Sequence, residues 1–167
     1  MTDLRVWIGC ESAYSDGKLH GQWVDIGEMQ NPRIDVQNAI KSILETSPAQ
    51  SEEWGIFDIE ADFDHCSSDS LDELIERLEL CNEWGEDAIY ALSMADGDVE
   101  RAKQIIDNGM YYANSLEEIG EQLVECELDE TNWLNGYLDY EAIGRDHLTS
   151  CYYAPDGNGG YYYTYQF

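Results

Sequence analysis

The most limiting feature of this sequence is its charge between residues 51 and 100, where 17 acidic side chains accompany a single base, Arg77. Over all 167 residues, 36 Asp and Glu face 8 Lys and Arg, so the net charge at pH 7 is −28. An excess of this size destabilises a compact state through self-repulsion. The charge therefore favours a fold that spreads its carboxylates over a large exposed surface.

The composition nevertheless predicts a folded chain. Hydrophobic residues make up 43% of it and aromatic residues 12%, which is too much for a disordered acidic tail. The acidity is also uneven, because residues 1–50 hold 7 acids and 4 bases and residues 101–167 hold 12 acids and 3 bases. A surface adapted to high salt would be acidic throughout. The central maximum instead favours a polyanionic surface with a specific use.

Such a surface suits a basic groove on another protein and repels nucleic acid and anionic membranes. The N-terminus lacks the pattern of a signal peptide, and no apolar run approaches the ~18 residues needed to span a bilayer. The five cysteines form no C-x-x-C pair, which is typical of reduced, mostly buried thiols. We expect a cytoplasmic protein that binds neither nucleic acid nor membrane.

Residues 1–61 predict a small β-sheet with one helix. Residues 4–10 and 19–26 alternate apolar and polar side chains, and the Ser-Asp-Gly-Lys sequence between them has turn chemistry, which indicates a β-hairpin. Residues 33–45 have apolar side chains at helical spacing between two prolines. Residues 52–63 return to a strand pattern, which completes a three-stranded sheet.

Residues 62–109 predict an acidic module of short helices. The segment 67–84, where the first helix is expected, begins with Ser and Asp residues suited to an N-cap, and Asn-Gly follows the last helix as a stop. The further helices are expected over 86–95 and 99–107.

Residues 110–167 predict a mixed third module. Ser115 and Glu118 have capping-box spacing at the start of one helix, and a second helix is expected over 139–148. The end has the pattern of a hairpin, with one tyrosine-rich face formed by Tyr161, Tyr163, Tyr165 and Phe167. The expected fold is α+β, an elongated chain of three small modules: 1–61, 62–109 and 110–167.

Four acids alternate along the third predicted strand: Asp58, Glu60, Asp62 and Asp64. In a strand they would share one face at roughly 6.6 Å intervals, twice the rise per residue. A calcium loop is the alternative, but Phe63 stands where such a loop requires glycine. We therefore expect an acidic row that faces solvent.

The next helix carries a second row, because Asp72, Glu76, Glu79 and Glu83 follow a spacing of four, three and four residues. This spacing places the carboxylates on one face, roughly 5 Å apart along the axis. A plain solvated face is the simplest interpretation. However, helices usually mix in bases to relieve such repulsion, and here we expect only Arg77 to do so. The uncompensated charge favours a surface that is used.

No enzymatic motif stands out. The three histidines are isolated, and no metal-ligand spacing, phosphate loop, nucleophile elbow or dinucleotide fingerprint occurs. A carboxylate pair of the glycosidase type remains an alternative, although nothing singles out two acids among 36. We predict no catalytic residues, no metal and no cofactor.

The charge density matches that of DNA. Duplex DNA carries one charge per roughly 1.7 Å of axis, so 28 excess charges correspond to roughly 48 Å of duplex. A compact chain of this length has a radius of gyration of roughly 15 Å, which is too small to display them in a row. We therefore expect carboxylates to stand in for phosphates in a basic DNA-binding groove. The candidates are Asp58, Glu60, Asp62, Asp64, Asp69, Asp72, Glu73, Glu76, Glu79, Glu83, Glu86, Asp87, Glu117, Glu118, Glu121 and Glu125.

The segment "YLDYEAIGRDHL", residues 137–148, resembles the signature of the ArdA antirestriction proteins. The N-terminal "VWIGCESAYSDGKLHGQWVDI" and the later "WGIFDIEADF" are similar to other segments of that family, in the same order. The tyrosine-rich "GGYYYTYQF" terminus departs from the family pattern. The residues that carry the signature are Tyr137, Asp139, Tyr140, Glu141, Arg145 and Asp146.

The resemblance implies an elongated, three-module homodimer, encoded on mobile genetic elements, that mimics bent B-form DNA. Such proteins bind the specificity and modification subunits of type I restriction-modification enzymes and block restriction and modification. The signature is expected near the dimer interface, where Arg145 forms either an ion pair with acids of the interface or a local pair with Glu141. The alternative function is a general acidic module that binds basic DNA-binding proteins.

Overall fold

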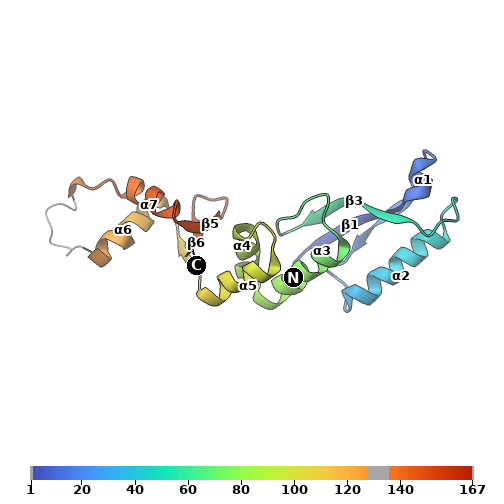
Figure 1. Ribbon diagram of the computed structural model, residues 1–167, viewed down its shortest axis with the longest axis horizontal. Coiled ribbons are helices and arrows are strands. Elements are labelled where there is room, and N and C mark those ends of the chain that lie inside the picture. The colour runs from blue at the N-terminus through green and yellow to red at the C-terminus, as the bar shows by residue number, and fades with distance from the viewer. Residues whose placement is uncertain (1, 128–135, 167) are drawn as a thin grey trace. The chain divides into compact units, whose positions relative to one another are not determined.

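The computed structural model describes residues 2–127 and 136–166 of the chain (Figure 1). It divides into two compact units, Met1–Leu92 and Ser93–Phe167, and each is described by itself. Helices accompany a three-stranded antiparallel sheet in each unit, which confirms the α+β class. The division into three modules stays a prediction.

The first sheet has the order β2-β1-β3, with both neighbours antiparallel to the central strand. Its strands are β1 (Leu4–Cys10), β2 (Gly21–Asp25) and β3 (Trp54–Ala61). Alternation along β1 buries one face of the sheet through Leu4, Val6, Ile8 and Cys10. Helix α2 (Pro32–Glu45) contacts β1 and β2 and contributes Val36, Ile40 and Ile43 to the core.

The connection between β1 and β2 differs from the predicted tight turn. A five-residue helix, α1 (Glu11–Ser15), follows β1 directly. Its Ala13 is buried, and the carbonyl of Ala13 accepts a hydrogen bond from the Lys18 backbone N–H at 2.9 Å. The turn residues therefore end this helix, with Gly17 at a φ of +76°, a value that suits glycine.

The predicted acidic helices are present as α3 (Leu71–Trp84), α4 (Glu86–Met94) and α5 (Val99–Asn108). Ser70 caps α3 in a closed capping box, since its hydroxyl accepts from the Glu73 N–H and the Glu73 carboxylate accepts from the Ser70 N–H. The buried face of α3 comprises Leu71, Leu74, Ile75, Arg77, Leu78, Leu80 and Cys81.

The second sheet has the order β4-β6-β5 and is antiparallel throughout. Its edge strand β4 (Tyr111–Ala113) is a short element that the sequence does not predict. The core of this unit joins the sheet to the helices through Ala113, Ile119, Leu148, Cys151 and Tyr163. The remaining elements are α6 (Leu116–Glu127), α7 (Tyr140–Leu148), β5 (Cys151–Pro155) and β6 (Tyr161–Tyr165).

Helices α6 and α7 cross at very close range through two glycines. A Cβ added at Gly120 would overlap the backbone carbonyl of Tyr140, and one added at Gly144 would overlap that of Leu116. Backbone atoms cannot swing aside as a flexible side chain can. The approach of α7 to α6 therefore requires glycine at both positions.

Replacing Gly144 with Ala should destabilise the second unit by about 1–3 kcal/mol, because the added methyl group forces the two helices apart. Thermal unfolding and amide hydrogen exchange of α6 and α7 would measure this. Gly136→Ala is the matched control, because a Cβ there meets no atom within 4 Å. Equal stability of the two variants would contradict the requirement.

Candidate functional site

The first acidic row begins in β3. Asp58 and Glu60 lie in the strand and are exposed. The strand ends at Ala61, so the prediction that one strand carries the row as far as Asp64 is wrong beyond that residue. The Asp62 carboxylate instead accepts a hydrogen bond from the Asp3 N–H at 2.8 Å, which ties the end of β3 to the residue before β1. Asp62 and Asp64 are nevertheless exposed.

A base from the central strand lies among these acids. Arg5 donates to Glu60 at 3.2 Å across the β1–β3 pair and contacts Asp25 of β2 at 2.5 Å. Its guanidinium also lies over the ring of Trp23, 5.2 Å from the centroid. This exposed cluster offsets part of the charge at the start of the row.

The second acidic row lies on α3. Asp72, Glu76, Glu79 and Glu83 are all exposed, opposite the buried apolar face of the helix. We call these four residues the α3 stripe. Because the α3 stripe lies on the face opposite the core, a partner can contact its carboxylates without unfolding any part of the first unit.

Arg77 does not relieve this stripe, which corrects the expectation from the sequence. Arg77 is 8% exposed and lies on the buried face of α3. The relief comes from α2, where the Arg33 guanidinium donates two hydrogen bonds to Glu79, at 3.1 and 3.2 Å, and lies 3.7 Å from Asp72. Hydrogen bonds from Arg33 to Glu79 raise the pKa of Arg33 further. No local sequence pattern indicated this pair, because its members are 46 positions apart.

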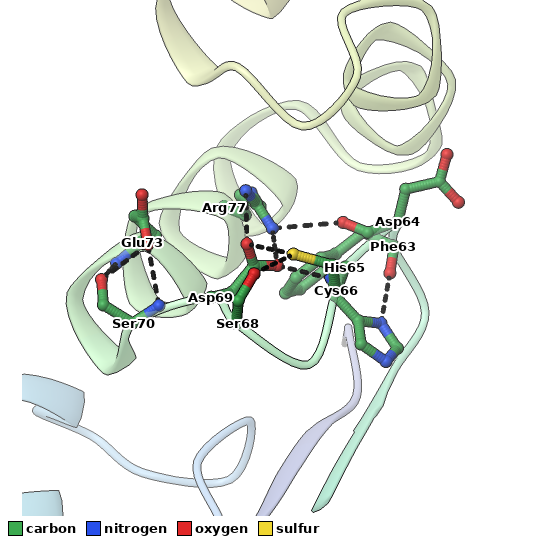
Figure 2. Close-up of polar contacts among 9 residues, drawn as sticks. All are labelled: Phe63, Asp64, His65, Cys66, Ser68, Asp69, Ser70, Glu73 and Arg77. Atoms are coloured by element: carbon green, nitrogen blue, oxygen red, sulfur yellow. Dashed lines mark hydrogen bonds and ion pairs between the residues drawn. The ribbon is translucent and has the colours of Figure 1, made fainter. Parts of the chain in front are cut away.

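Arg77 pairs with Asp69 in the segment that precedes α3 (Figure 2). The two guanidinium contacts to this carboxylate measure 2.5 and 3.4 Å. Burial raises the pKa of Asp69, but hydrogen bonds from Arg77 and from the backbone and thiol of Cys66 outweigh that effect. The net result is a pKa lowered to about 2. Asp69 is thus largely buried and engaged within the fold, whereas the other candidate carboxylates of this unit are exposed.

The remaining candidates lie on α4 and α6. Glu118 is half-buried at the start of α6, where Asn114 donates to its carboxylate at 2.7 and 2.8 Å, and these hydrogen bonds lower the pKa of Glu118. The Glu118 N–H donates to Ser115 at 3.1 Å, so half of the predicted capping box is present. The exposed members are Glu86, Asp87, Glu117, Glu121 and Glu125.

The signature segment forms α7 and the residues before it. Asp139 caps the helix by accepting from the Ala142 N–H at 3.0 Å. Arg145 forms the local pair with Glu141 at 2.5 Å, and both side chains are about 60% exposed. Tyr137 and Asp146 are also exposed, and Tyr140 is half-buried. The interface role of Arg145 stays a prediction.

The cysteines are free thiols. Cys10, Cys81 and Cys151 are buried, and Cys66 and Cys126 are exposed. Burial raises the pKa of Cys81 to about 11, which keeps it protonated. Within residues 2–127 and 136–166, no group of three His, Cys, Asp or Glu could hold a metal ion. In the same residues, no helix is long and apolar enough to cross a membrane.

Residues 2–127 and 136–166 thus present acidic rows that are exposed to solvent. The family described as antirestriction protein (ArdA) matches residues 6–162. The chain belongs to the ArdA family. As an ArdA protein it is an antirestriction protein, from a family of inhibitors whose interaction is with restriction-modification enzymes. The match extends to Tyr162 and so includes part of the tyrosine-rich terminus. A comparison with curated proteins gives no match.

The Asp69–Arg77 pair should make the stability of the first unit sensitive to acid. Because the pKa of Asp69 is lowered on folding, from 3.8 to about 2, its contribution is complete above about pH 4 and is lost as the pH falls through about 2. The shift corresponds to about 2 kcal/mol. The free-energy difference between the parent protein and Asp69→Asn should therefore shrink by about this amount between about pH 5 and pH 2.

Urea unfolding followed by Trp fluorescence would measure this difference, since the first unit contains Trp7, Trp23, Trp54 and Trp84. Asp87→Asn, at an exposed position of α4, is the control for removing one charge. A difference that stays constant over the pH range would contradict the assignment.

Proposed function

We propose that this ArdA protein inhibits type I restriction-modification enzymes by occupying their DNA-binding groove as a mimic of B-form DNA. The observation that carries the proposal is the pair of exposed acidic rows in the first unit. The first row runs from Asp58 and Glu60 of β3 to Asp62 and Asp64 beyond the end of the strand, and the α3 stripe is the second row. Only Arg5 and Arg33 form ion pairs with these eight carboxylates in the part of the chain that the structure describes.

Physical chemistry supports the comparison with phosphate. Spacings of roughly 5 to 6.6 Å along a helix or strand are close to the separation of successive phosphates. Hydrogen bonds from Ser70 lower the pKa of Glu73, so this carboxylate is ionised at neutral pH. A basic groove would attract such a surface over a long range and give fast, salt-sensitive association.

The proposed target is the complex of specificity and modification subunits, so that modification is blocked together with restriction. The protein would act in the cytoplasm of the host cell as a homodimer, without enzymatic activity and without binding nucleic acid. The alternative is a general acidic module for basic DNA-binding proteins. The two differ because a mimic prefers a groove shaped for duplex DNA, whereas a general module shows little preference.

The deciding experiment is a competition assay. The protein is titrated into a type I methyltransferase complex that holds labelled DNA, at two salt concentrations. We expect stoichiometric displacement of the DNA that weakens at the higher salt, because charge contacts carry the affinity. A histone-like basic protein bound to the same DNA is the control. Equal displacement from both proteins would favour the general module, and displacement from neither would reject the proposal.

Charge spread over rows predicts a graded response to substitution. Replacing one residue of the α3 stripe with its amide should weaken binding by less than about threefold, and replacing all four by about tenfold or more. The measurement is the dissociation constant for the methyltransferase complex. A control with the same charge change replaces four acids outside the proposed surface, Asp16, Glu28, Glu45 and Glu52. Equal losses in both variants would show that only net charge matters.

Arg145 tests the proposed dimer. If its guanidinium also relieves repulsion between two acidic protomers, Arg145→Glu should weaken the homodimer, which light scattering would detect as a lower mass at micromolar concentration. The local pair with Glu141 would be lost as well. Circular dichroism is therefore needed to show that α7 remains folded. A dimer of unchanged mass would reject the interface role.

A further inference from the structure

Residues 62–70, which we call the acidic loop, connect β3 to α3 and carry Asp62 and Asp64 of the first row. At its start, Asp62 binds the Asp3 N–H, and the next side chain, Phe63, is 3% exposed in the core. At its end, Ser70 caps α3. The conformation between these anchors contributes, together with the packing of the buried face of α3, to how the acids of β3 and the α3 stripe lie relative to each other.

Arg77 contacts this loop at two places. Its guanidinium binds the Asp69 carboxylate through two nitrogens and donates to the Asp64 backbone carbonyl at 3.4 Å. Figure 2 shows that the Asp64 side chain points away from Arg77, so its carboxylate stays on the exposed side while its backbone is held. The planar guanidinium suits such a double contact, which a lysine ammonium cannot reproduce.

Asp69 also binds Cys66, in the middle of the acidic loop. Its carboxylate accepts from the Cys66 backbone N–H at 2.7 Å and from the Cys66 thiol at 3.1 Å. The Asp69 N–H in turn donates to the Cys66 carbonyl at 3.1 Å. The Asp69 and Arg77 side chains are each only 10% exposed, so solvent screens this pair little. One buried base thus restrains the acidic loop at Asp64, Cys66 and Asp69.

We propose that Arg77 and Asp69 form a clamp that sets the register between the acids of β3 and the α3 stripe, which makes Arg77 a positioning residue for inhibition. This role rests on the proposed function. It explains why the stretch of 51–100, with 17 acids, keeps one base and places it away from the acidic surface. A mimic needs its charges in the positions of phosphates, and charge alone does not supply those positions.

For the affinity of an Arg77 variant, the clamp predicts the opposite change to the one that net charge predicts. Arg77→Met makes the protein more negative by one charge, so electrostatics alone predicts tighter binding to a basic groove. The clamp predicts weaker binding. Because a single substitution leaves Asp69 charged and buried, the main variant replaces both members, Arg77→Met with Asp69→Ala, and keeps the net charge unchanged.

The experiment measures displacement of labelled DNA from the type I methyltransferase complex over a series of salt concentrations, together with amide hydrogen exchange of the free protein. For the double variant we expect affinity about tenfold lower at about 0.1 M salt and a shallower dependence of log Kd on log salt, since fewer charges engage the groove. The Cys66 and Asp69 amides should exchange faster. A loss of folded fraction would lower the apparent affinity without changing the salt slope.

Lys41→Met with Glu45→Ala is the matched control, because it removes an exposed ion pair of the same unit and also keeps the net charge. It should change affinity by less than about twofold. Two results would overturn the clamp. One is amide exchange of Cys66 and Asp69 in the double variant at the rate of the parent protein. The other is weaker binding in which log Kd depends on log salt as steeply as in the parent protein. Failure of the parent protein itself to displace DNA would reject the proposed function, and with it the clamp's role in inhibition, whereas exchange would still report on the loop.

Discussion

Repulsion between carboxylates is the constraint on which the arrangement of this chain depends, and the few bases are used where it matters most. Arg5 joins acids on both neighbours of its strand, Asp25 and Glu60. Arg33 contacts two acids of α3 from α2. Exposed ion pairs of this kind are individually weak. Here each one lies where two acidic elements are brought together, so its value is to offset repulsion between segments distant in the sequence.

The regular elements could be predicted from local patterns, and the contacts between them could not. The helix of residues 33–45, the acidic helices, the first sheet and the C-terminal hairpin follow from periodicity, turn residues and caps such as Ser70, whereas the edge strand β4 was not predicted. The end of β3 at Ala61 was not predicted, because the alternation of acids continues past it, whereas the Asp62 carboxylate accepts a hydrogen bond from the N–H of Asp3, the residue before β1. The role of Arg77 was also missed, because its partner Asp69 lies before the helix begins and no local pattern indicates that pair.

The signature segment combines requirements of two kinds. Gly144 is required by the close crossing of α7 and α6, and Asp139 is required as the N-cap of α7. Both have a sufficient explanation in the fold of the second unit. Tyr137, Glu141, Arg145 and Asp146 are exposed and contribute little to the core. If part of the segment serves an interaction, these exposed residues carry it, and the two structural positions only present them.

A protein that imitates DNA faces two requirements that its sequence must meet separately. The first is charge, which almost any exposed acid supplies and which can be redistributed with little loss. The second is geometry, which depends on a few buried contacts because solvated carboxylates repel one another and hold no fixed arrangement. In the first unit, those contacts are the capping box of Ser70, the backbone hydrogen bond accepted by Asp62 and the buried pair of Asp69 with Arg77. Residues of this second kind should tolerate substitution far less than the acids that they position.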